Sequence, residues 1–285
     1  MKISLSTLAC PNWTLPQAVE LAGRSGYDGL ELRFLEGEDF LWKLPAFQGR
    51  ELHYTRRLIS ESGLAIVCLD TSCRFDSPDP LEREKWLSEG ERMSELAAKL
   101  GAPAIRVFGD RIQTGADREA TVTWISDSLN LLVERSRDSS VEVWLETHGD
   151  FASAADVQAV LSDCPEVQII WDPACAIVER SERPLESGRA LQRWIRHVHI
   201  KDLRNENGSW TPVLTGEGTL PLSEIRTVLE TIGYSGFLSF EWEKKWHPSI
   251  EVAEIAVPHF ANWFRSHWSA LGPAHSLDTV QGGTR

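Results

Sequence analysis

The feature that most constrains the fold is a repeated alternation of short apolar runs with longer helical patterns. The runs are rich in Val, Ile and Leu, which suits strands buried on both faces; they span Lys2 to Ser6, Gly29 to Arg33, Ala65 to Asp70, Ala104 to Phe108, Val141 to Glu146, Val167 to Asp172, His197 to Lys201 and Gly236 to Glu241. The helical patterns cover Leu15 to Ser25, Gly49 to Ser62, Leu81 to Leu100, Asp117 to Arg137, Ser153 to Ser162, Pro184 to Trp194, Pro221 to Ile232 and Glu251 to Trp263. Strands that alternate with helices are expected to be parallel, because each helix carries the chain back across the sheet.

Glycines mark the ends of several of these helical patterns. Gly26, Gly63, Gly101 and Gly233 each lie just before the next strand, where a left-handed residue usually ends a helix. The repeated units predict a single domain over residues 1–268, a length that suits one α/β barrel. Residues 269–285 lack periodicity, and we expect them to form a flexible C-terminal tail.

Polar residues at the ends of the predicted strands favour a closed barrel over an open sheet. They are Glu31, Arg33, Asp70, Arg106, Glu146, His148, Asp172, His199, Lys201, Glu241 and Glu243. A barrel enzyme builds its active site at this rim, whereas an open sheet gathers such groups at one switch point and usually has a glycine-rich phosphate turn. No such turn follows the first strand. We therefore predict a (β/α)8 TIM barrel.

Composition narrows the classes of partner. A formal net charge of −13 opposes binding to nucleic acid, which requires clustered Lys and Arg. The five cysteines form no CxxC pair, so neither a disulfide framework nor a thiolate zinc site is expected. The N-terminal run lacks the features of a signal peptide, and no stretch is long and apolar enough to span a membrane. We expect a cytoplasmic protein whose partner is a small molecule.

Four of the rim residues form a candidate metal site. Glu146, Asp172, His199 and Glu241 would meet at one rim of a parallel barrel. Three carboxylates and one imidazole suit Mn²⁺, Mg²⁺ or Co²⁺, and they can also hold Zn²⁺. The alternative for each carboxylate is a helix cap or a structural ion pair. His197 has the same side-chain parity as His199, so strand alternation does not separate the two.

Six short motifs carry a family resemblance. They are ELRF from Glu31, ETHGD from Glu146, WDPA from Trp171, HVHIKD from His197, GEG from Gly216 and FEWE from Phe240. Together they resemble the sugar phosphate isomerase and epimerase superfamily of xylose isomerase-like TIM barrels, and are similar to ketose 3-epimerases and inosose dehydratases. The similarity covers Lys2 to Trp263.

The resemblance implies roles for the four ligands. Glu146, Asp172, His199 and Glu241 would hold one divalent ion, with Mn²⁺ the first expectation, and both glutamates would also move protons. Many relatives have a histidine three residues after the aspartate, and this chain has Cys175 there. That departure leaves one substrate contact of the family in question, with packing as the expected role of Cys175. Family members are often dimers or tetramers, so a homo-oligomer is compatible with the resemblance.

Further residues are candidates for binding substrate: Glu31, Arg106, His148, Lys201, Glu217 and Trp246. Each has a structural alternative: Arg106 and Lys201 can pair with neighbouring carboxylates, His148 can cap a loop and Glu31 can serve as a hydrogen-bond acceptor. Glu217 lies in the segment from Asp202 to Gly218, which is either a mobile lid or an ordinary surface loop. Tryptophans expected beside the rim are Trp13, Trp42, Trp171, Trp210, Trp242 and Trp246.

These residues predict an enzyme that removes a proton next to a carbonyl group. The first reading is a metal-dependent isomerase or epimerase of keto-sugars, with Glu146 and Glu241 as the proton-transfer pair and the identity of the base left open. The second is a lyase that dehydrates a keto-cyclitol or cleaves a 3-keto-glycoside by β-elimination. A non-catalytic sugar-binding barrel would not need paired glutamates. An AP endonuclease-like repair enzyme would need more histidines at the strand ends and would bind DNA against the negative charge.

Overall fold

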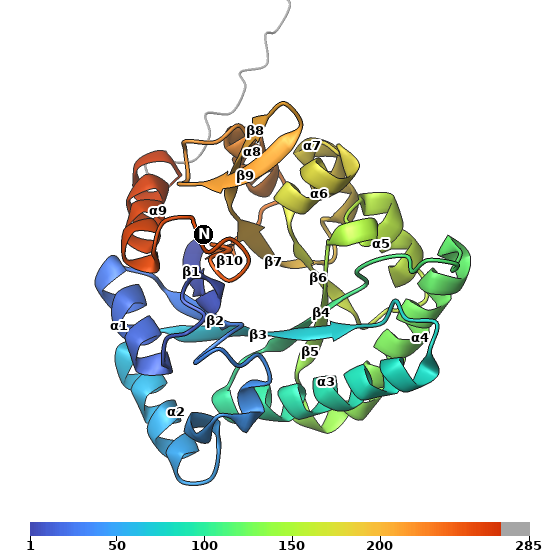
Figure 1. Cartoon of the computed structure of the whole chain (residues 1–285), viewed down its shortest axis with the longest axis horizontal. Helices are drawn as coiled ribbons and strands as arrows, with labels where there is room; N and C mark the ends of the chain where they lie inside the picture. The colour runs from blue at the N-terminus through green and yellow to red at the C-terminus, as the bar shows by residue number, and fades with distance from the viewer. Residues whose placement is uncertain (269–285) are drawn as a thin grey trace, which may run out of the picture.

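A computed structural model of the chain describes residues 1–268, which form a closed parallel barrel surrounded by helices (Figure 1). The barrel strands are β1 (Lys2–Ser6), β2 (Gly29–Leu32), β3 (Ala65–Arg74), β4 (Ala104–Phe108), β5 (Glu142–Glu146), β6 (Gln168–Trp171), β7 (Ile195–Ile200) and β10 (Phe237–Phe240). Their order around the barrel is β1-β10-β7-β6-β5-β4-β3-β2, and β1 closes the ring by pairing in parallel with both β10 and β2. The predicted TIM barrel is confirmed. The predicted tail, residues 269–285, lies outside the described residues.

Helices cover the outside of the barrel. They are α1 (Leu15–Ser25), α2 (Glu51–Ser62), α3 (Pro80–Leu100), α4 (Arg118–Arg135), α5 (Ala154–Leu161), α6 (Pro173–Arg180), α7 (Pro184–Leu191), α8 (Leu222–Thr231) and α9 (Ala253–His267). Short 3₁₀ helices lie at Thr7–Ala9, Leu41–Lys43, Pro45–Phe47, Arg137–Ser139 and Gly149–Phe151. Helix α6 was not predicted. None of the helices within residues 1–268 has both the length and the apolar character needed to cross a membrane.

The segment predicted as a loop or lid is instead a β-hairpin. Strands β8 (Asp202–Glu206) and β9 (Ser209–Val213) pair in antiparallel fashion directly after β7. Asn207 and Gly208 join them with φ angles of 53° and 87°, the left-handed pair that a two-residue hairpin turn requires. The rim above β7 is therefore built from regular structure.

The interior of the barrel contains two successive layers of side chains, which come from the same strands. Cys68, Ala104, Trp144 and Ile170 form a separate apolar cluster, here called the apolar layer. Two residues further along the same chain segments lie Asp70, Arg106, Glu146 and Asp172, all buried. Side chains two residues apart on a strand face the same side, so both sets point into the barrel. The second set, together with His199, Lys201 and Glu241, is here called the charged layer.

The main hydrophobic core lies between the strands and the helices. It includes Trp171 and Trp242, which are fully buried. Each directly neighbours an inward-facing residue, Asp172 or Glu241, so alternation turns the tryptophan toward the helices. Trp171 packs beside Gly188 of α7, where an added Cβ would lie 3.0 Å from the indole. The expectation that these two tryptophans border the rim was therefore wrong.

Candidate metal centre and active site

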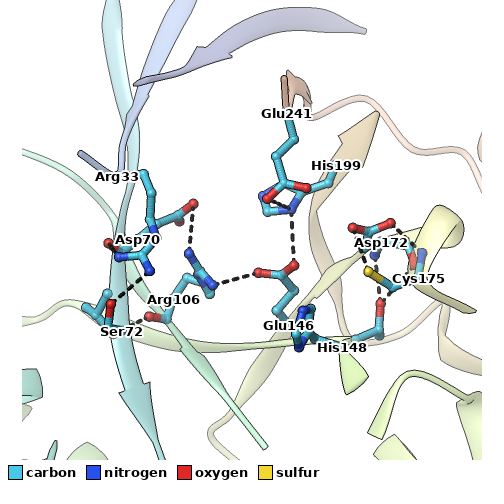
Figure 2. A network of polar contacts seen from close by, with 12 residues as sticks. Arg33, Asp70, Ser72, Arg106, Glu146, His148, Asp172, Cys175, His199 and Glu241 are labelled. Atoms are coloured by element: carbon cyan, nitrogen blue, oxygen red, sulfur yellow. Dashed lines mark hydrogen bonds and ion pairs between the residues drawn. The ribbon is translucent and has the colours of Figure 1, made fainter. Parts of the chain in front are cut away.

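The four predicted metal ligands converge at the carboxyl ends of four strands. Ligand atoms of Glu146, Asp172, His199 and Glu241 all lie within 4.8 Å of one another, and all four residues are buried. Glu146 ends β5, Asp172 directly follows β6, His199 lies near the end of β7 and Glu241 directly follows β10. In Figure 2, His199 lies between Glu241 and Glu146, and Asp172 lies to the right of Glu146, beside Cys175. The four residues that the sequence predicts to meet at one rim therefore do lie together in the structure.

The orientation of His199 fits a metal ligand. Its Nδ1 lies 3.5 Å from Glu146 Oε1 and 3.4 Å from Glu241 Oε1. This buried nitrogen has no hydrogen-bond partner. On the other side of the ring, Nε2 lies 3.1 Å from Glu31 Oε2. If Nε2 donates its proton to Glu31, Nδ1 keeps a free lone pair that faces the carboxylates, as in carboxylate–histidine–metal arrangements.

Glu31 and His197 lie behind this site. His197 Nε2 is 2.6 Å from the same Glu31 oxygen, and its ring stacks on Trp144 of the apolar layer. The two histidines of β7 are thus distinguished by depth in the barrel: His199 faces the carboxylates, and His197 faces Glu31. Glu31 is fully buried and orients both rings. Its position matches the structural hydrogen-bonding alternative that the sequence left open.

Arg106 links Glu146 to Asp70 inside the charged layer. Its Nη1 lies 3.0 Å from Glu146 Oε2, and its Nη2 lies 3.4 Å from Asp70 Oδ2. Burial alone would raise the pKa of Glu146, but Arg106 and His199 outweigh it and hold the pKa well below its usual range. Burial, followed by the neighbouring Glu31 carboxylate, raises the pKa of Asp70 well above its usual range. Arg106 therefore favours the ionised form of Glu146.

Lys201 is the second buried cation of the site, and it contacts three carboxylates. Its Nζ lies 2.8 Å from Asp172 Oδ2, 2.6 Å from Glu241 Oε2 and 2.7 Å from Glu243 Oε1. Burial raises the pKa of Glu241, and Lys201 only partly opposes that effect. The two glutamates thus share one pattern, since each presents Oε1 to His199 and Oε2 to a fixed cation. They differ in the direction of their pKa shifts.

Asp172 is also the N-cap of helix α6. Its Oδ1 accepts a hydrogen bond from the Cys175 backbone N–H at 2.9 Å, and Pro173 occupies the first turn, where proline is favoured. The Cys175 thiol lies 3.2 Å from Asp172 Oδ2. Burial, followed by the charge of Asp172, raises the pKa of this thiol well above its usual range. Cys175 therefore contacts a candidate ligand directly, which is more than the packing role expected from the sequence.

A cavity of about 380 Å³ opens onto the charged layer. It is lined by Leu8, Arg33, Ser72, Arg74, Arg106, Phe108, Asp110, Glu146, His148, Lys201, Glu241, Glu243 and Trp246. Of the four candidate ligands, Glu146 and Glu241 line the cavity, whereas Asp172 and His199 do not. A molecule in the cavity would meet the two glutamates first.

The remaining predicted residues divide into two groups. Arg106, His148, Lys201 and Trp246 line the cavity. His148 Nδ1 lies 3.2 Å from Asp110 Oδ1. Trp246 is half exposed, and its ring packs edge-on against Phe34 with 5.6 Å between the ring centroids. Burial alone would lower the pKa of His148, but the hydrogen bond to Asp110 raises it overall. Glu31 and Glu217 are absent from the lining, and Glu217 is exposed beyond the hairpin.

Several cavity residues were not assigned a site role from the sequence. Arg33 and Asp110 follow strands, while Ser72 and Arg74 lie on β3, which extends to Arg74 rather than ending at Asp70 as predicted. Arg33 was visible as a polar residue at a strand end. Ser72 and Arg74 were hidden by the predicted boundary, because the run of polar residues after Asp70 resembles a loop.

The family assignment follows from the sequence pattern and agrees with the fold. Residues 19–266 match the family model described as xylose isomerase-like TIM barrel. The chain belongs to this family. No curated protein sequence matches it significantly.

Solved structures with the same fold include enzymes of more than one class. The 3-keto-D-glucoside 4-epimerase YcjR from E. coli is 20% identical, with a TM-score of 0.74 over 93% of this chain and 99% of that one. The probable 3-DHS dehydratase AsbF from Bacillus anthracis is 21% identical, with a TM-score of 0.72 over 92% and 98%. The IOLI protein, solved with a binding zinc atom, is 19% identical, with a TM-score of 0.78 over 93% and 97%. At these identities the likeness establishes the shared fold.

Proposed function

We propose that the protein is a metal-dependent isomerase or epimerase that moves a proton on the carbon next to the carbonyl of a keto-sugar. The observation that carries the proposal is the placement of Glu146 and Glu241, which both belong to the ligand set and both face the cavity. A divalent ion held by Glu146, Asp172, His199 and Glu241, which we propose to be Mn²⁺, would polarise the carbonyl and acidify the neighbouring C–H bond.

The chain's own residues supply the proton transfers. One glutamate removes the proton from one face of the substrate, and the other returns a proton to the opposite face. Arg106 beside Glu146 Oε2 and Lys201 beside Glu241 Oε2 keep each carboxylate in one orientation. The pair can work in either direction, because an epimerase interconverts both configurations. Trp246 at the mouth of the cavity offers an aromatic surface to the apolar face of a sugar.

A lyase on the same scaffold is supported by one additional feature. His148 and Asp110 lie side by side on the cavity wall, with 3.2 Å between Nδ1 and Oδ1, separate from the two glutamates. A third proton carrier is not needed for epimerisation, but it suits the protonation of a departing hydroxyl or aglycone oxygen. In this second proposal a glutamate removes the α-proton and His148 protonates the leaving group.

Proton NMR in D₂O tests the proposal. The Mn²⁺-supplemented protein is incubated with ketohexoses, inososes and 3-keto-glycosides. Deuterium at an α-carbon with only isomers formed would support the isomerase or epimerase. Loss of a hydroxyl or aglycone, with an enone formed, would support the lyase. Absence of exchange across the panel would contradict both.

Matched variants tie any exchange to the site. Glu146→Gln and Glu241→Gln should each abolish measurable exchange, because an amide cannot carry the proton. Glu20→Gln, an exposed glutamate on α1, serves as the control and should exchange at the wild-type rate. Exchange that persists in both cavity variants would show that another group removes the proton.

A further inference from the structure

One wall of the cavity contains a buried cation that has no ion-pair partner among residues 1–268. Arg33 directly follows β2 and is only 6% exposed, yet it lines the cavity. Its Nη2 donates to Ser72 Oγ at 2.8 Å, and its Nη1 lies 3.5 Å from the Asp70 backbone carbonyl. Within residues 1–268 it forms no ion pair with any carboxylate. The guanidinium stacks over the Phe34 ring, with 4.5 Å from Cζ to the ring centroid.

The other buried cations of the site are paired. Arg106 contacts two carboxylates and Lys201 contacts three. Asp39 approaches Arg33 only through Ser72, whose hydroxyl donates to Asp39 Oδ2 at 2.6 Å. Burial, followed by repulsion from Arg106, lowers the pKa of Arg33 to about 10. Burying an unpaired charge is costly, so a residue in this state is better explained by a ligand than by stability.

Surrounding groups indicate what kind of anion would fit. Arg74 stands at the same wall with its side chain 45% exposed, and its nearest carboxylates, Asp110 and Asp76, are 3.8 and 4.0 Å away. One buried guanidinium matches the planar geometry of a carboxylate, to which arginine binds through two parallel hydrogen bonds. A phosphate dianion fits less well, because Asp110, Glu146 and Glu243 also line the cavity.

Position in the cavity indicates where the anionic group lies on the substrate. Figure 2 shows Arg33 and Ser72 on one side of Arg106, and Glu146 with the rest of the metal ligands on the other. A group held by Arg33 would therefore be remote from the carbon that exchanges its proton. Resting on the function proposed above, we propose that the substrate is a keto-sugar acid whose terminal carboxylate binds Arg33, with Ser72 and Arg74 beside it.

Matched ligand pairs test this proposal by binding alone. D-fructuronate and D-fructose differ only at C6, as do D-tagaturonate and D-tagatose. Isothermal titration into the Mn²⁺-supplemented wild-type protein should give tighter binding of each acid by about 10- to 100-fold, the range expected for a hydrogen-bonded charge pair. Equal binding within both pairs, or no binding of either acid, would overturn the proposal.

Variants of Arg33 and Ser72 test whether these two residues cause the preference for the acids over the neutral ketoses. Arg33→Met should remove the preference for the acids while changing the affinity for the neutral ketoses less than twofold. Ser72→Ala should weaken acid binding by a smaller factor, because it removes only the hydrogen bond that orients Arg33. Retention of the full preference in Arg33→Met would overturn the assignment.

Thermal unfolding separates a ligand role from a structural role for Arg33. Without ligand, Arg33→Met should unfold at the same temperature or higher, because it replaces an unpaired buried charge with an apolar chain of similar length. A marked loss of thermal stability would show that Arg33 is structural and would overturn the proposal. Acids that bind through Arg33 without deuterium exchange would instead contradict the proposed function and leave this subsite intact.

Discussion

The apolar layer and the charged layer occupy the same strands, two residues apart, and have opposite energetics. Trp144 and Ile170 are buried among apolar neighbours, so their burial stabilises the fold. Glu146 and Asp172, the next inward residues after them, are equally buried but lie among other charges. Similar burial therefore stabilises the fold in the apolar layer, whereas in the charged layer it brings ionisable groups close together.

Unsatisfied polar atoms mark the boundary between the layers. Buried side-chain atoms without a hydrogen-bond partner include Glu31 Oε1, Asp70 Oδ1 and Nδ1 of both His197 and His199. Such atoms are uncommon in folded proteins, where most buried polar groups are hydrogen-bonded. Their concentration in and behind the charged layer supports the proposed ion and substrate site. The comparison predicts that changes in the two layers affect different measurements.

The largest expected effect is loss of catalysis from the charged layer. Glu241→Gln should lower kcat/KM by about 10³-fold or more, because it removes both a metal ligand and a proton carrier. The melting temperature in excess Mn²⁺ should stay close to that of the wild type, since glutamine keeps the side-chain volume. Steady-state kinetics and thermal unfolding on the same preparation check this. Near-normal turnover would remove Glu241 from the mechanism.

A matched pair on β6 and its end separates the layers directly. Ile170→Ala should lower the free energy of unfolding by about 2–5 kcal/mol, because it leaves a cavity in the apolar layer. Asp172→Asn should leave unfolding little changed, because asparagine also caps a helix well, but should weaken Mn²⁺ binding. Denaturant unfolding and metal titration of both variants test the contrast. Similar stability losses in the two variants would contradict the division into layers.

An intermediate effect, on Mn²⁺ affinity, is expected from a change of Glu31, which contacts the His199 ring. Glu31→Gln weakens the acceptor that holds the Nε2 proton, so Mn²⁺ affinity should fall by about 10- to 100-fold. Competition with a fluorescent chelator measures the change. His53→Gln, an exposed histidine on α2, is the control for the loss of a titratable side chain and should bind the ion normally. Unchanged affinity in Glu31→Gln would mean that Glu31 does not orient the ligand.

The smallest effect is expected at Glu217. Its side chain is exposed and lies outside the cavity lining, so Glu217→Gln should change kcat/KM less than twofold. Steady-state kinetics of Glu217→Gln and Glu241→Gln, measured in parallel, compare the loss of an exposed glutamate with the loss of a cavity glutamate. A tenfold loss would show that this segment reaches the substrate during turnover.

The barrel and the ligand set were predictable from the sequence because both depend on local patterns. Each barrel strand is a short apolar run, and each candidate ligand lies near the end of such a run or directly follows it, so position in the chain places Glu146, Asp172, His199 and Glu241 at one rim. Alternation also determines the burial of Trp171 and Trp242, although their position at the ends of the predicted strands obscured it.

Other features required finer local signals. The Asn207-Gly208 dipeptide is a strong hairpin signal between β8 and β9, but the surrounding polar residues resemble a flexible loop. Helix α6 begins at Pro173, and only its Asp172 cap separates it from β6, so no loop signal in the sequence marks the change from strand to helix.

Spatial pairing could not be predicted from one sequence. The isolation of Arg33 depends on which carboxylates pair with Arg106 and Lys201, and those partners lie on the neighbouring strands of the barrel, far away in the sequence. The same limit applied to His197 and His199, since only the placement of Glu146 and Glu241 beside Nδ1 of His199 shows which ring faces the candidate metal ligands.

An anomalous difference map from a crystal grown with MnCl₂ tests the proposed metal site most directly. One peak is expected, bounded by Glu146, Asp172, Glu241 and Nδ1 of His199, with Nε2 of His199 still directed at Glu31. A peak beside His197, or no peak at the charged layer, would contradict it.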